Sequence, residues 1–139
     1  MTIRLRTVSF LAVLAATIAL TVTPASAATT YRTTDVNHSP AVGSACDENS
    51  YFVVCYEQHG DEIYVKDKKA DGHAIVVNFW WADGDNYVCR NSLGAKSGWT
   101  WCNNLHNLIP ENDYLTLWGW VDDNGSPMAG TGIKFDANT

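Results

Sequence analysis

Basic residues are scarce in this chain, and they form no long cluster. Its 139 residues include 9 Lys and Arg against 15 Asp and Glu, which gives a formal net charge of −6 with neutral histidines. The closest group of cations is the short run Lys66, Lys68 and Lys69. Nucleic acids and anionic membrane surfaces require a larger basic footprint. We therefore expect neither as a partner.

The sequence also lacks the usual motifs for catalysis, cofactors and metals. It has no Gly-x-Ser-x-Gly turn for a nucleophilic serine, no phosphate-binding loop, and no Cys-x-x-Cys or His-x-x-x-His spacing for zinc. Acidic turns at residues 83–86 and 122–124 offer oxygens for calcium, but neither follows the ligand order of an EF-hand. We therefore expect no cofactor and no metal, and the balance favours a non-enzyme.

Apolar residues with a helical period of 3.6 are missing beyond two turns. Short stretches rich in β-branched and aromatic residues take their place, separated by turn signals such as Asp123-Asn124-Gly125. This pattern predicts an all-β fold, a small antiparallel β-sandwich with about seven short strands. The expected strands cover residues 51–56, 62–67, 73–81, 87–90, 99–102, 114–121 and 130–135.

The long apolar run of this chain lies near its start. Two arginines precede an apolar stretch at residues 8–22, and Pro24 and small residues then lead to Ala27. This pattern is typical of a secretory signal peptide, which we place at residues 1–27. A membrane anchor is the alternative, but a spanning helix needs about 20 apolar residues and threonines interrupt this run. We expect an extracellular product with a net charge of −8 and no membrane contact after cleavage.

The remainder is predicted to be one domain. Residues 28–45 are rich in Thr, Ser and Asn, which indicates a polar segment that lies across the surface or is partly flexible. Residues 46–139 contain no linker, repeat or low-complexity tract, so they are expected to form a single β domain.

The four cysteines are even in number, which indicates two disulfides in an exported domain of this size. Four cysteines allow three pairings, and the sequence does not choose among them strictly. We favour Cys46–Cys55 and Cys89–Cys102 because each pair is close in sequence. The second pair is expected to bridge the two arms of one hairpin.

The six tryptophans include two Trp-x-Trp pairs. Residues alternate between the faces of a strand, so Trp99 and Trp101 share one face while Cys102 points to the other. In the second pair, Trp118 and Trp120 lie opposite a Leu/Val set that is the natural core face. If the two strands pair, all four indoles stand on one outward face.

An open face of this kind would be a binding site. A sugar ring stacks its C–H groups on an indole, and neighbouring polar side chains take its hydroxyls; candidates for that role are Asn103, Asn104, Asp122 and Asp123. An extracellular protein is the other candidate partner, because Trp and Tyr are preferred anchors. The alternative is that the tryptophans simply pack inside the fold.

Two stretches, GDEIYVKD (residues 60–67) and ADGHAIV (residues 70–76), precede a cysteine, a Gly-containing loop and a second cysteine. This arrangement resembles uncharacterised small secreted actinobacterial proteins, similar to those of Streptomyces, with two disulfides. The resemblance implies export and a compact β fold and points to no activity. Secreted α-amylase inhibitors of the same bacteria have a similar build, but their Trp-Arg-Tyr recognition triplet is absent here.

Three functions remain open. The first is a secreted non-catalytic binding or structural domain that binds carbohydrate or a protein through its tryptophans. The second is an inhibitor of an extracellular hydrolase, for which residues 91–98 are the best candidate for a protruding loop. The third is a small glycoside-acting hydrolase, which needs two carboxylates across a groove; the adjacent acids at 61–62, 83–85 and 122–123 all lie in predicted turns, where Asp is common.

Overall fold

The computed structural model describes residues 27–82 and 84–139, so the predicted leader lies, apart from Ala27, outside the described residues. The chain is all-β, as predicted. A single short 3-10 turn, η1 (Ala95–Ser97), is the helical element of the described part. The strands are β1 (Thr29–Arg32), β2 (Thr34–Asp35), β3 (Ala45–Glu48), β4 (Phe52–Glu57), β5 (Glu62–Asp67), β6 (Ala74–Trp80), β7 (Tyr87–Asn91), β8 (Trp99–Cys102), β9 (Tyr114–Asp123), β10 (Ser126–Pro127) and β11 (Ile133–Asn138).

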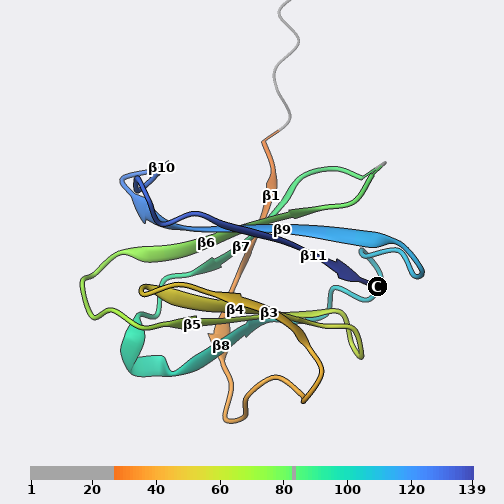
Figure 1. The fold of residues 1–139 in the computed structure, drawn as a ribbon, viewed down its shortest axis with the longest axis horizontal. Coiled ribbons are helices and arrows are strands. Elements are labelled where there is room, and N and C mark those ends of the chain that lie inside the picture. The colour runs from red at the N-terminus through yellow and green to blue at the C-terminus, as the bar shows by residue number, and fades with distance from the viewer. Residues whose placement is uncertain (1–26, 83) are drawn as a thin grey trace, which may run out of the picture.

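The strands form two sheets that lie face to face (Figure 1). Sheet A has the order β1-β7-β6-β9-β10, and β11 also pairs with β9; sheet B has the order β2-β8-β5-β4-β3. All neighbours are antiparallel except β1 and β7, which run parallel. The sandwich prediction is thus confirmed. The seven predicted strands are present, and the structure adds the short strands β1, β2, β3 and β10.

The core lies between the two sheets and follows the strand alternation. On β9 the side chains of Leu115, Leu117 and Val121 point inward and are almost fully buried, as the sequence predicted. Gly119 lies in the same inward row. Only glycine fits at this position, because a side chain there would meet the ring of Phe52 at 2.9 Å. The other strands contribute Phe52, Val54, Ile63, Val65, Ile75, Val77, Phe79, Cys89, Cys102 and Ala137 to this core.

The polar segment at residues 28–45 connects the two layers. Its first strand, β1, joins the edge of sheet A, and two residues later β2 joins the edge of sheet B. Between them the backbone N–H of Thr33 donates a hydrogen bond of 3.0 Å to the carbonyl of Arg90. Figure 1 shows this part of the chain passing from one layer to the other. The sequence does not reveal these strands, because they are short and polar.

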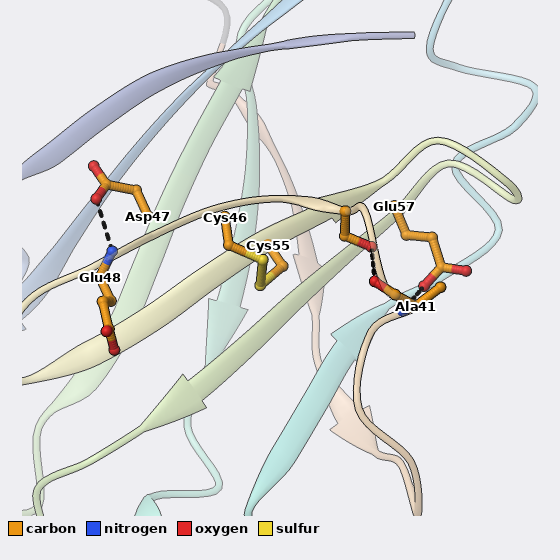
Figure 2. Close-up of a disulfide and its surroundings, with 7 residues drawn as sticks. Ala41, Cys46, Asp47, Glu48, Cys55 and Glu57 are labelled. Atoms are coloured by element: carbon orange, nitrogen blue, oxygen red, sulfur yellow. Dashed lines mark hydrogen bonds between the residues drawn. A yellow bond between two sulfur atoms is a disulfide. The ribbon is translucent and has the colours of Figure 1, made fainter.

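Both favoured disulfides are present, but the second lies in a different place from the one expected. Cys46 and Cys55 are register partners in the β3–β4 hairpin, so this disulfide lies within one sheet (Figure 2). Cys89 of β7 and Cys102 of β8 lie in different sheets, with their Cα atoms 6.0 Å apart. The prediction that the second disulfide bridges the arms of one hairpin is wrong, because the chain changes sheet between β7 and β8.

The described part of the chain contains no helix that is both long and apolar enough to cross a membrane.

Candidate functional site

The four tryptophans predicted to share a face lie on two different faces. Trp99 and Trp101 belong to β8, which pairs with β5 and β2 in sheet B. Trp118 and Trp120 belong to β9, which pairs with β6, β10 and β11 in sheet A. Each pair points away from the core, as alternation predicted. The hypothesis of one four-indole face is wrong, because the two strands never pair and each sheet turns its outer side away from the other.

The outer face of sheet B is partly covered by the segment between β2 and β3. Tyr64 occupies an outward position on β5, yet its side chain is only 1% exposed. The ring of His38 packs edge-on against Trp101, at 5.5 Å between ring centroids, and lies 5.9 Å from Tyr64. The backbone N–H of Ala41 donates a bond of 2.8 Å to Glu57 (Figure 2). These contacts hold residues 36–44 against part of the sheet. Trp99 and Trp101 are half-buried, and each still lines a hollow, of about 560 Å³ at Trp99 and about 620 Å³ at Trp101.

The buried tyrosine of that face is held in its neutral form. Its hydroxyl donates a hydrogen bond of 2.9 Å to Oε2 of Glu62. Burial and this bond both raise the pKa of Tyr64 well above the ordinary tyrosine value. Tyr64 packs against both indoles, with ring centroids 6.4 Å from Trp99 and 5.7 Å from Trp101.

The outer face of sheet A carries exposed aromatic side chains. Trp118 is 36% exposed. Tyr114, which lies two residues before Thr116 on the same strand, is 69% exposed. Trp120 is 9% exposed and packs against Trp118, with ring centroids 4.5 Å apart and planes tilted by 44°. Trp80 of β6 is the cross-strand partner of Thr116, so it stands beside this row. We call Tyr114, Trp80, Trp118 and Trp120 the aromatic strip.

Only two of the four residues of this strip, Trp118 and Trp120, were predicted from the sequence. Trp80 and Tyr114 were not proposed as site residues, although the period-2 pattern of their strands places both outward. The signal was hidden in β6, where Ile75, Val76, Val77 and Phe79 make both faces look apolar. Packing alone shows which of those apolar positions faces sheet B.

A polar hollow of about 520 Å³ lies at the end of the strip nearest Trp120. Its main side chains are His73, Arg90 and Asp122. Nη2 of Arg90 donates to Oδ2 of Asp122 at 2.6 Å, while Oδ1 of the same carboxylate accepts the N–H of Gly125 at 3.0 Å. The full lining is Gly72, His73, Ala74, Arg90, Ser92, Asp122, Asn124 and Gly125.

The hairpin after β9 forms one wall of this hollow. Asn124 and Gly125 both have positive φ values, 52° and 89°, which is the conformation that an Asn-Gly turn favours. The turn predicted from the sequence at this point is therefore confirmed. Of the four polar residues proposed as sugar contacts, Asp122 lines the hollow and Asp123 stands beside it, whereas Asn103 and Asn104 follow β8 in the other sheet.

The buried carboxylates of the described residues do not form a catalytic pair. Asp61 precedes β5 and accepts a hydrogen bond from the hydroxyl of Tyr56, whereas Asp67 is the last residue of β5. Six residues of strand separate them by about 20 Å, which is far more than the roughly 5–9.5 Å between the two carboxyl groups of a glycosidase. Asp122 lies on the outer face of the opposite sheet. The buried carboxylates therefore give the hydrolase hypothesis no pair, whereas the half-buried Glu57 and Glu62 are register partners in the β4–β5 hairpin on the outer face of sheet B.

Asp67 gives a testable pH dependence of stability. Burial raises the pKa of its carboxyl above the ordinary 3.8, although the N–H of Lys69, at 2.7 Å from Oδ1, opposes the shift. The folded protein therefore binds this proton more tightly than the unfolded chain does, and the stability that the proton provides is lost as the pH rises from 3.8 through the folded pKa.

Asp67→Asn keeps the oxygen that accepts the Lys69 bond and removes the titration. We expect the variant to gain stability relative to wild type as the pH rises from about 4. Urea unfolding of both proteins at a series of pH values measures this difference. A difference that stays constant, or that changes in the opposite direction, contradicts the assignment.

Within residues 27–82 and 84–139, no group of three or more His, Cys, Asp or Glu side chains is arranged to hold a metal ion. The acidic turn at 83–86 that was considered for calcium includes Asp83, which lies outside the described residues. In the other turn, both oxygens of Asp122 already accept hydrogen bonds from protein donors.

Comparison with protein-family models, with curated proteins and with solved structures finds no match for this chain. The function is therefore inferred from the geometry of the two outer faces and the loops around them.

Proposed function

We propose that this chain is a secreted, non-catalytic domain that binds a carbohydrate through the outer face of sheet A. The observation that carries the proposal is the aromatic strip, which exposes Trp118 and Tyr114 and has a hollow lined by charged side chains at its Trp120 end. Indoles supply flat apolar surface for sugar C–H groups, and Arg90, Asp122 and Asn78 supply donors and acceptors for hydroxyls. Ligand sites commonly combine apolar surface with a few well-placed polar groups in this way.

Secretion is part of the same proposal. The leader pattern at residues 1–27 predicts export, and two disulfides are typical of oxidising compartments. An extracellular polysaccharide is a ligand that such a domain would meet there.

Trp118→Ala is expected to weaken glycan binding by about 10–30-fold, because a central aromatic anchor contributes about 1.4–2 kcal/mol. The measurement is calorimetric titration of the wild-type and variant proteins with a panel of soluble polysaccharides, followed in parallel by tryptophan fluorescence. Val42→Ala, which removes an exposed apolar side chain from the segment beside the other sheet, is the matched control and should bind as wild type does. Absence of glycan binding by the wild type, or equal binding by Trp118→Ala, refutes the proposal.

An inhibitor of an extracellular hydrolase is the second candidate, and one loop favours it. Residues 92–98 join β7 to β8, and the Cys89–Cys102 disulfide closes their base. Gly94 and Gly98 have φ values of 77° and 67°, which favour glycine, and Leu93 is 45% exposed. A loop held in one shape loses less entropy on binding. Inhibition of a hydrolase panel that is lost in Leu93→Ala but kept in Trp118→Ala would establish this function instead.

A further inference from the structure

Two arginines stand side by side on the face that carries the aromatic strip. Arg32 of β1 and Arg90 of β7 are register partners in the parallel pair. Tyr31 and Cys89, their neighbours, point toward the core, so both arginines occupy outward positions. Like charges placed directly opposite each other destabilise a sheet. The fold therefore holds an unfavourable pair of cations at the edge of the proposed binding face.

The protein itself neutralises only half of this charge. Arg90 forms an ion pair with Asp122, with 2.6 Å between Nη2 and Oδ2. Arg32 is exposed and, among the described residues, forms no ion pair. The cluster of two guanidinium groups and one carboxylate thus keeps a net positive charge.

The arginine pair is continuous with the aromatic strip. The register places Arg32, Arg90, Val76 and Trp120 in one row across four strands. Strands lie about 4.8 Å apart, so the Arg90 backbone is about 10 Å from that of Trp120. Lys134 of β11 is the cross-strand partner of Trp118, and its Nζ lies over the ring of Trp80, 5.3 Å from the ring centre. A chain of sugars lying over the indoles would therefore meet the arginine pair at the sheet edge and this ammonium group within the strip.

The charge of this face differs from that of the rest of the protein. The outward positions of β1, β7, β6, β9 and β11 hold three Lys or Arg residues and two Asp residues. The remainder of residues 28–139 holds four Lys or Arg residues against 13 Asp or Glu residues. The net charge of this face thus favours a polyanion, whereas the net charge of the remainder opposes one.

We propose that the ligand of the aromatic strip is an anionic glycan, whose carboxylate or phosphate groups bind at the Arg32–Arg90 pair. This inference rests on the proposed function and names its ligand class. A guanidinium group forms paired hydrogen bonds with either anion, and Arg32 has all its side-chain donors available among the described residues. Lys134 gives a second, weaker contact over Trp80.

The test is calorimetric titration of the exported protein with three probes of similar length. These are an oligogalacturonate, which carries carboxylates, a poly(glycerol phosphate), which carries phosphates, and a neutral glucan. We expect one anionic probe to bind at least 10-fold more tightly than the glucan at low salt. Raising the salt from about 0.1 M to about 1 M shortens the screening length from about 10 Å to about 3 Å and should remove this preference.

Arg32→Ala should weaken binding of the preferred anionic probe by about 5–30-fold and leave glucan binding unchanged. Lys96→Ala removes an equal charge from an exposed position on η1 and should have little effect. The inference is overturned if neutral and anionic probes bind equally tightly, or if Arg32→Ala binds the anionic probe as tightly as the wild type does. If Trp118→Ala loses glucan binding in that case, the proposed carbohydrate-binding function stands without the anionic-glycan inference. If none of the three probes binds, the proposed function and the inference both fail.

Discussion

Replacing both Cys89 and Cys102 with alanine is expected to lower the free energy of unfolding by about 2–5 kcal/mol. This disulfide joins β7 of sheet A to β8 of sheet B, and both cysteines are buried within the core cluster. Its loss removes a cross-link from the unfolded chain and also leaves space between the sheets. For a domain with a marginal core, a loss of this size is a large fraction of the total stability.

The other disulfide provides the matched comparison. Cys46 and Cys55 are direct cross-strand partners in the β3–β4 hairpin, and Cys46 is exposed at the edge of sheet B. The backbone ladder still pairs these strands when the bond is absent, so the double Cys→Ala variant should lose about 1–2 kcal/mol. The chain-entropy model by itself predicts something different, an equal loss of about 3 kcal/mol for each bond, because the two closed loops are similar in length. Equal losses in urea unfolding would show that position between the sheets does not matter.

Phe52→Ala is expected to destabilise the fold by about 3–5 kcal/mol. The ring of Phe52 is fully buried and fills the space in front of Gly119, where a side chain on β9 would clash with it. Because glycine offers no side chain that could move into the vacated space, the cavity would remain open. Val54, the other neighbour of Gly119, is β-branched and stiff, so it cannot fill that space either.

Urea unfolding followed by circular dichroism measures this loss, and Tyr114→Ala is the control. Tyr114 lies on the same strand as Gly119 but is 69% exposed, so its loss should change stability by less than about 0.5 kcal/mol. If Phe52→Ala costs no more than the control does, the contact between Phe52 and Gly119 does not hold the two sheets together.

The predictions made from single strands succeeded. The alternation of β9 correctly separated a buried Leu/Val row from outward tryptophans, because side chains on a strand alternate with a period of two wherever the backbone is extended. The cysteine pairs were also correct, since short sequence separation favours closure. The strands β1 and β2 could not be found this way, because they have four and two polar residues and owe their conformation to the sheet edges that they join.

The predictions about pairing failed for a common reason. The sequence says which side of a strand is apolar, but it does not say which strand becomes its neighbour. Residues 92–98 carry the chain from sheet A to sheet B, and this one crossing moved Cys102, Trp99 and Trp101 away from the strands expected beside them. Sequence spacing measures separation along the chain, whereas hydrogen-bonded pairing depends on contacts between distant segments.

The residue pattern was enough to predict an all-β chain with outward-facing tryptophans and to favour two local disulfides, because these features depend on periodicity and on residues close in sequence. The packing of the sheets was needed to show that residues 36–44 lie against the Trp99–Trp101 face and that Trp118, unlike Trp120, is exposed on the outer face of sheet A. It also places Trp80, Tyr114, Arg32 and Arg90 on that outer face. These positions come from four strands that are far apart in the chain, and packing of the sheets brings them together.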